Sequence, residues 1–99
     1  MKQVLFVCLG NICRSPSAEA VFNAMIERNK LEYEISCDSA GTAAYHEGEP
    51  ADYRMRQFAL KRGYKLTSIS RPVNSTIDFD RFDYIVGMDR QNVRDLKAM

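Results

Sequence analysis

The residues from Val4 to Cys8 form an unbroken apolar run, and this run sets the strongest limit on the architecture. It has the length of a strand, and a strand that is apolar on both faces suits the centre of a parallel sheet covered on both sides. A short stretch containing glycine follows. Ser15 and Pro16 then predict a helix start, with serine at the N-cap and proline at the first helical position. An apolar stripe continues this helix for about four turns, through Ala18, Val21, Phe22, Met25 and Ile26.

The rest of the chain repeats the alternation of strand and helix. Residues 33–38 alternate between apolar and polar types, which predicts a half-buried strand. The apolar spacing of residues 51–62, followed by Gly63, predicts a second helix with a glycine stop. Residues 82–88 predict a third strand, and Asp89 can cap a last helix. This order predicts an α/β fold with three layers, αβα, built around a parallel sheet.

The composition limits the number of domains and the kinds of partner. A chain of 99 residues allows one small domain, residues 1–99. Lys and Arg number 14 against 13 Asp and Glu, so the net charge of +1 gives no strong field, and we expect neither nucleic acid nor membrane as a partner. The apolar run to Leu9 is too short for a membrane span or a secretion signal. Three cysteines, an odd number, argue for a reducing compartment, and we expect the cytoplasm.

The loop after the first strand carries the chemistry. Cys8 ends the strand, and Arg14 follows just before the predicted helix start. Backbone N–H groups of a tight loop, the helix N-terminus and the arginine fork can together bind an anion such as phosphate. The same positive field lowers the pKa of a cysteine thiol and makes a thiolate nucleophile available near neutral pH. The spacing Cys-x5-Arg is weak by itself, but its place between a buried strand and a helix start makes it specific.

Residues 4–20 read VLFVCLGNICRSPSAEA, and this run resembles the signature of the low-molecular-weight protein tyrosine phosphatases. Further segments similar to that family are DSAGT at 38–42, GEPADYR at 48–54 and FDYIVGMD at 82–89. The resemblance covers essentially the whole chain. It implies a phosphatase I-like fold and hydrolysis of phosphotyrosine in a protein or peptide through a phosphocysteine intermediate, without a metal or other cofactor.

The resemblance also implies roles for single residues. Cys8 would be the nucleophile, Arg14 the clamp on the phosphate, and Ser15 the group that hydrogen-bonds the thiolate and eases its departure. Asn11 would hold the loop, through Ser39. The substrate-binding set implied in this way comprises Leu9, Gly10, Asn11, Ile12 and Cys13 of the loop, together with Tyr45, which would line the cleft that grips the substrate ring.

The chain departs from the family pattern at the general acid. Family members continue through a fourth strand and further helices, and a loop there carries an Asp-Pro whose Asp is the acid; this sequence contains no Asp-Pro. Compared with that pattern, we expect residues 1–99 to be a single phosphatase domain that is incomplete at its C-terminus, and the chain to be either a fragment or a short protein without the acid. General acid catalysis is typically worth ~10²–10⁴-fold, so we expect residues 1–99 alone to be weakly active. We also expect one face and one edge of the sheet to lack cover.

Three other functions stay open at this point. An arsenate reductase shares the fold and the Cys-x5-Arg loop, but it needs further resolving cysteines, for which Cys37 on a strand is a poor candidate. A phosphoarginine phosphatase is another relative, and those tend to carry threonine where this loop has Ile12. A phosphate-binding module that binds an oxyanion without turnover would need no general acid.

The remaining reactive residues have ordinary structural interpretations. The resemblance implies a reversible disulfide between Cys13 and the nucleophile, although a small loop residue without a redox role is equally consistent. We expect Cys37 in the core, His46 on a surface loop rather than as a base, and Asp89 as a helix cap rather than an acid. No ligand pair has metal-like spacing, and we expect no metal.

Overall fold

The computed structural model describes all 99 residues, and its strands and helices alternate largely as predicted. The strands are β1 (Lys2–Cys8), β2 (Ile35–Gly41) and β3 (Tyr84–Gly87). The helices are α1 (Arg14–Arg28), α2 (Tyr53–Lys61), α3 (Asp78–Arg81) and α4 (Arg90–Lys97). No helix is both long enough and apolar enough to cross a bilayer.

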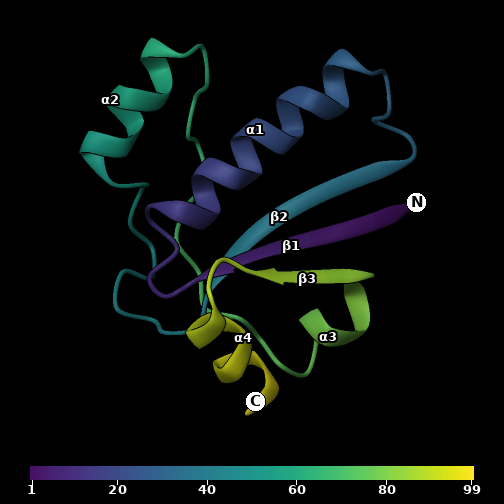
Figure 1. Cartoon of the computed structure of the whole chain (residues 1–99). Helices are drawn as coiled ribbons and strands as arrows, with labels where there is room; N and C mark the ends of the chain where they lie inside the picture. The colour runs from purple at the N-terminus through teal and green to yellow at the C-terminus, as the bar shows by residue number, and fades with distance from the viewer.

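The three strands form one parallel sheet in the order β2-β1-β3. Leu5 of β1 lies opposite Asp38 of β2 and Ile85 of β3. Figure 1 shows α1 across one face of this sheet and α3 and α4 on the other, with α2 beside α1. The structure therefore confirms the predicted three-layer α/β fold with a parallel sheet.

The central strand is apolar because both of its faces are covered. Leu5 and Val7 have no exposed surface and form a core with Ala40, Phe82 and Leu96. Full burial of such a side chain contributes roughly 1.5–3 kcal/mol. On the opposite face, the Phe6 ring packs edge-on against Phe22 of α1, with 5.4 Å between ring centroids.

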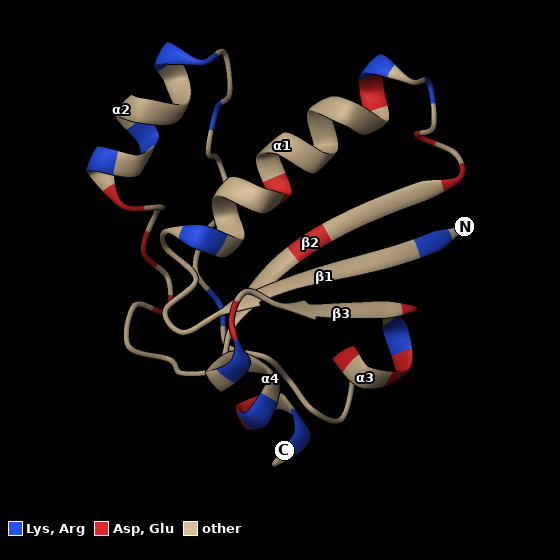
Figure 2. Ribbon diagram, viewed as in Figure 1, with Lys and Arg blue, Asp and Glu red and all other residues tan.

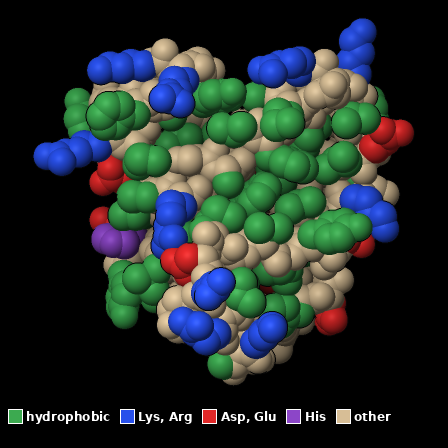
Figure 3. Space-filling view, in the orientation of Figure 1, with side chains coloured by type: hydrophobic (Ala, Val, Ile, Leu, Met, Phe, Trp, Pro, Cys, Tyr) green, Lys and Arg blue, Asp and Glu red, His purple; other side chains and the backbone are tan.

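The outer strand β3 is covered on one face only. Ile85 packs against the core, whereas its neighbours Tyr84 and Val86 are exposed by 58% and 39%. Val86 lies opposite Phe6 in the register, so the exposed face of β3 is the one on the α1 side. Figure 3 shows hydrophobic side chains gathered over α1 and the sheet below it. This exposure fits the expectation that part of the sheet lacks cover.

Three predicted boundaries were wrong. The first helix begins at Arg14 and not at Ser15-Pro16, and Ser15 is no cap because its hydroxyl bonds inside the loop. Tyr33 lies in a turn before β2 and is exposed by 91%, so the second strand begins later than predicted. The third strand is four residues long, shorter than the predicted run of 82–88.

The ends of α2 and the start of α4 agree with the capping residues in the sequence. The Asp52 side chain accepts a hydrogen bond from the Met55 N–H and caps α2. Gly63 follows that helix with a φ of +86°, a left-handed conformation that glycine adopts without strain. The Asp89 carboxylate accepts from the N–H of Asn92, whose side chain bonds back to the Asp89 N–H. Asp89 is therefore a helix cap, as predicted.

Candidate active site

The loop from Cys8 to Ser15 lies at the carboxyl end of the central strand and leads into α1. In open α/β sheets, ligands bind beyond the carboxyl ends of the strands, which is the edge where this loop lies. Cys8 is buried, and its Sγ atom lies 3.0 Å from the hydroxyl oxygen of Ser15. The thiol thus lies at the base of the loop, beside the fully buried Ser15.

A chain of hydrogen bonds holds the Ser15 hydroxyl in place. The Asn11 side-chain N–H₂ donates to Ser15 Oγ (2.8 Å) and to Ser39 Oγ of β2 (3.0 Å). The Ser39 hydroxyl donates in turn to the Glu19 carboxylate on α1. Ser15 Oγ accepts from Asn11, and its single proton has two acceptors in reach, the Ala40 carbonyl at 3.4 Å and the Cys8 sulfur at 3.0 Å. When the thiol ionises, the nearer and charged sulfur is the stronger acceptor.

Asn11 has the backbone conformation that turns the loop. Its φ is +57°, in the left-handed region that asparagine tolerates better than most residues, and its side chain is buried. The side-chain oxygen accepts a hydrogen bond from the Arg71 N–H, 3.0 Å away. With its two donors also used, Asn11 is fully bonded behind the loop and does not line the cleft.

The surroundings of Cys8 favour its ionised form. Burial alone would raise the pKa of the thiol, but several groups outweigh that effect and lower the pKa. They are the hydrogen bond from the Ser15 hydroxyl, the backbone N–H groups of Ser15 and Asn11, and the charge of Arg14. The helix adds to the same field, since no side chain caps the N-terminus of α1.

Arg14 lies at the rim of the loop and pairs with the cap residue of α4. Its Nη1 atom donates to Asp89 Oδ2 over 2.7 Å, with both side chains about half exposed. This hydrogen bond raises the pKa of Arg14 and lowers the pKa of Asp89. Figure 2 shows the basic residue at the start of α1 and the acidic residue leading into α4. The guanidinium keeps further donors for a ligand.

A surface loop that contains Tyr45 and His46 forms one wall of the cleft above the thiol. Its lining includes the predicted Tyr45, whose side chain is largely exposed, and also His46, which sequence reasoning placed on the surface. His46 Nδ1 lies 2.6 Å from the Glu49 carboxylate. The complete lining is Cys8, Leu9, Gly10, Ile12, Cys13, Arg14, Tyr45 and His46.

The pKa values of the other two cysteines are raised rather than lowered. Burial and the nearby Asp52 and Cys8 raise the pKa of Cys13, which lines the cleft. Burial, followed by Glu19 and Asp38, raises the pKa of Cys37 to about 12. Cys37 also donates to Asn23 Oδ1 on α1. All three cysteines are free thiols, and nowhere do three His, Cys, Asp or Glu side chains gather closely enough to hold a metal ion.

Several residues around the loop were missed by sequence reasoning. They are Glu19, which accepts from Ser39; Asp89 in its second role as partner of Arg14; and Ser70 and Arg71, which bond the back of the loop. The position of Asp89 could have been predicted, because Asp89 follows β3 and Arg14 follows β1, and neighbouring parallel strands end at the same edge of the sheet. The contacts of Ser70 and Arg71 join residues 60 positions apart and leave no local pattern.

The fold and the loop together define a class: α/β proteins that carry a cysteine of lowered pKa in a tight loop at the end of a central parallel strand. The sequence model of the family described as "Low molecular weight phosphotyrosine protein phosphatase" matches residues 3–99, and the chain belongs to this family. The family resemblance seen in the motifs is thereby confirmed.

Individual relatives agree with this assignment. The low molecular weight phosphotyrosine protein phosphatase of Gallus gallus is 50% identical over 97 residues, which are 98% of this chain and 61% of the relative. A crystal structure of a protein tyrosine phosphatase from Entamoeba histolytica superposes with a TM-score of 0.95 at 54% identity, covering 99% of this chain and 62% of that one. A drosophila arginine phosphatase superposes with a TM-score of 0.92 at 37% identity, covering 100% and 61%. The chain thus spans about three fifths of the length of these relatives.

Proposed function

We propose that this protein hydrolyses phosphotyrosine in proteins or peptides, with Cys8 as the nucleophile. The observation that carries the proposal is the Cys8 thiol, whose pKa is lowered by the Ser15 hydroxyl and by loop N–H groups at the end of the central strand. The same donors that stabilise a thiolate also suit the oxygens of a phosphate. Membership of the phosphotyrosine phosphatase family supports this choice of substrate.

The proposed reaction has two steps. In the first, the Cys8 thiolate attacks phosphorus, the bond from phosphorus to the tyrosine oxygen breaks, and the phenolate leaves and takes its proton from water. In the second, water attacks phosphorus, the S–P bond breaks, and phosphate and the thiolate are released. Arg14 would bind two phosphate oxygens with its planar fork, and Ser15 would stabilise the returning thiolate by a hydrogen bond. Tyr45 would form the wall against the substrate ring.

One specific observation favours a second candidate substrate. The drosophila arginine phosphatase has the same fold over the whole of this chain at 37% identity, so phosphoarginine is the alternative to phosphotyrosine. The loop residue Ile12, which lines the cleft, is the position where the two kinds of enzyme are expected to differ. Arsenate reduction and oxyanion binding without turnover are further outcomes that the same experiment separates.

The test measures phosphate release from para-nitrophenyl phosphate, a phosphotyrosine peptide and a phosphoarginine peptide. We expect release from both aryl phosphates, with a phosphocysteine on Cys8 trapped by acid quenching. Cys8→Ser should abolish phosphate release, whereas the matched variant Cys37→Ser should retain it, because Cys37 is outside the cleft. Arg14→Lys should lose most of the turnover while remaining folded, because lysine has no bidentate fork.

Each of the other results contradicts the proposal in its own way. Faster release from phosphoarginine would change the substrate class. Production of arsenite coupled to thiol oxidation would indicate a reductase. Phosphate protection of Cys8 against alkylation, with no turnover of any substrate, would leave only a binding module. Undiminished turnover in Cys8→Ser would remove Cys8 from the mechanism.

A further inference from the structure

A segment of irregular structure, residues 69–73, runs behind the anion loop, and we name it the strap. The Ser70 hydroxyl donates to the Gly10 carbonyl over 2.8 Å, and the Arg71 N–H donates to the Asn11 side-chain oxygen over 3.0 Å. These two oxygens of the loop are therefore bonded on its back. With these oxygens turned away from the cleft, the front of the loop keeps its N–H groups for the thiolate and an anion.

The strap has no helix or ladder of its own to fix its position. Its regular pairing consists of two isolated bridges, Gly41 with Pro72 and Pro50 with Ile69. Four backbone bonds join it to its neighbours: Gly41 N–H to Arg71 O and Val73 N–H to Gly41 O at the end of β2, and Gly48 N–H to Ser70 O and Ser70 N–H to Glu49 O in the loop before α2. None of these four bonds reaches the anion loop or α3, and each contact of the strap with those two elements involves a side chain.

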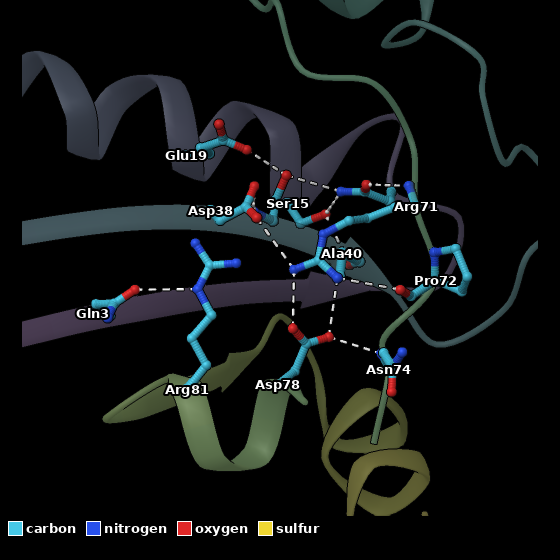
Figure 4. Close-up of polar contacts among 12 residues, drawn as sticks. Gln3, Ser15, Glu19, Asp38, Ala40, Arg71, Pro72, Asn74, Asp78 and Arg81 are labelled. Carbon is cyan, nitrogen blue, oxygen red and sulfur yellow. Dashed lines mark hydrogen bonds and ion pairs between the residues drawn. The ribbon is translucent and has the colours of Figure 1, made fainter. Parts of the chain in front are cut away.

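The side chain that anchors the strap is the Arg71 guanidinium. It donates to both carboxylate oxygens of Asp78 on α3, over 3.0 and 3.3 Å, and to Asp38 on β2 over 3.2 Å. Asp78 is 2% exposed and also accepts from the Asn74 N–H. Figure 4 shows the Arg71 guanidinium between Asp38 and Asp78. A bidentate pair of this kind fixes orientation as well as distance.

We infer that Arg71 is a positioning residue: its guanidinium fixes the strap to α3 and β2, and the strap holds Gly10 and Asn11 of the anion loop in place. This inference rests on the proposed function of the loop. Its effect passes from Arg71 to Asn11, from Asn11 to the Ser15 hydroxyl, and from there to the Cys8 sulfur. Arg71 touches neither the thiol nor the cleft lining, so it acts only through these partners.

The structure also explains why the anchor is sensitive to substitution. Burial alone would raise the pKa of Asp78, but the hydrogen bonds from Arg71 and from the Asn74 backbone outweigh burial and lower the pKa. Removing the guanidinium leaves a buried carboxylate with one backbone donor, which is costly. The strap then has to shift until Asp78 finds water or another donor, and the bond to Asn11 shifts with it.

The experiment measures the rate at which iodoacetamide alkylates Cys8 as a function of pH, by mass spectrometry of the intact 99-residue chain. Arg71→Gln is expected to raise the apparent pKa of Cys8 and to slow alkylation at pH 6 by about tenfold, the change for one pH unit. The rate at high pH, where the thiol is fully ionised, should stay the same. Arg71→Lys keeps the charge without the fork and should give an intermediate shift. A purely structural role would lower the unfolding temperature without moving this profile.

The matched control is Arg81→Gln on α3, the helix that carries Asp78. Arg81 donates to Gln3 and stacks over Phe82, and none of its bonds reaches the loop, so its profile should equal that of the parent protein. An unchanged Cys8 profile in a folded Arg71→Gln overturns the inference. If that variant does not fold, Arg71→Lys and the charge-balanced double substitution Arg71→Gln/Asp78→Asn decide in the same way. A parent protein whose Cys8 titrates at its ordinary pKa contradicts the proposed function itself, so the two failures are distinguishable.

Discussion

At the scale of single residues, the three cysteines show how position decides reactivity. Cys8 and Cys13 are both in the loop, yet their pKa values move in opposite directions. The difference is that Cys8 accepts from a hydroxyl and two backbone N–H groups, whereas Cys13 has Asp52 and the Cys8 charge nearby. Cys37 is half-buried beside Glu19 and Asp38 and stays a neutral thiol. Cys8 is therefore the most acidic of the three thiols and the first to become a thiolate as the pH rises.

This difference predicts the order of alkylation by iodoacetate. At pH 6, Cys8 should react measurably, while Cys37, with a pKa of about 12, should not react at all. A lowered pKa means that the thiolate persists as the pH falls below the ordinary value of 9.0 and is lost only as the pH falls through the folded value. The thiolate's contribution to the free energy of unfolding is complete above the pKa of the unfolded chain and is lost as the pH falls through the folded pKa. Peptide mass mapping after timed alkylation checks this, with bound phosphate expected to protect Cys8. Equal rates for Cys8 and Cys37 would contradict the anion-binding interpretation of the loop.

Single residues also mark the limit of what the sequence could predict. Cys8, Arg14 and Ser15 follow one another along one loop, so spacing and resemblance were enough to bring them together. Asn11 was predicted to hold the loop through Ser39, and the hydrogen bond between them is present. Its bond to the Arg71 backbone joins two irregular segments, whose paths follow no periodic pattern. No property of residue 71 in the sequence distinguishes it from any other surface arginine.

At the scale of elements, the strands and helices were predictable because their patterns are local. β1 was found from its apolar run and α4 from its cap, and both depend on residues within one element. The start of α1 was misplaced because Ser15 has the type of an N-cap but is used by the thiol and Asn11. Elements deviate from local preference where a site makes another demand on the same residue.

The end of β2 gives a prediction that belongs to this scale. A Cβ atom on Gly41 would lie 2.7 Å from the Leu9 carbonyl and 3.0 Å from that of Ala43, both backbone atoms. Gly41→Ala must therefore push the loop away from the strand and should destabilise the fold by about 1–3 kcal/mol, the usual cost of overpacking. Urea denaturation measures the loss, and Cys8 alkylation should slow in the folded variant because the loop has moved.

A second glycine serves as the control for that substitution. Gly63 has a φ of +86° and no neighbour within 4 Å, so Gly63→Ala strains only its own backbone. It should lower stability without changing the reactivity of Cys8. If Gly41→Ala behaved like Gly63→Ala, with a normal Cys8, the close approach between β2 and the loop would have no bearing on the site.

At the scale of the whole molecule, the site is assembled from both sides of the sheet. The loop and α1 supply the thiol and the arginine, while α4 on the opposite layer supplies Asp89 and the strap ties in α3. Sequence reasoning predicted these layers but not how α4 meets the loop, because that contact spans 75 positions. The layered fold thus brings together, at one edge of the sheet, groups that no single segment contains.

The arrangement of acidic groups around this edge leads to a prediction about leaving groups. No carboxylate lines the cleft, and the hydrogen bond from Arg14 lowers the pKa of Asp89, which keeps that carboxylate ionised and unable to donate a proton at neutral pH. A general acid is typically worth ~10²–10⁴-fold, and its help grows with the basicity of the leaving oxygen.

We therefore expect the turnover of these 99 residues to fall steeply along a series of aryl phosphates as the phenol becomes less acidic. Para-nitrophenyl phosphate should be hydrolysed slowly and phosphotyrosine far more slowly, measured as kcat/KM under one set of conditions. A flat series would mean that a proton donor lies within residues 1–99, and the variants Asp89→Asn and His46→Gln would then show which side chain supplies the proton.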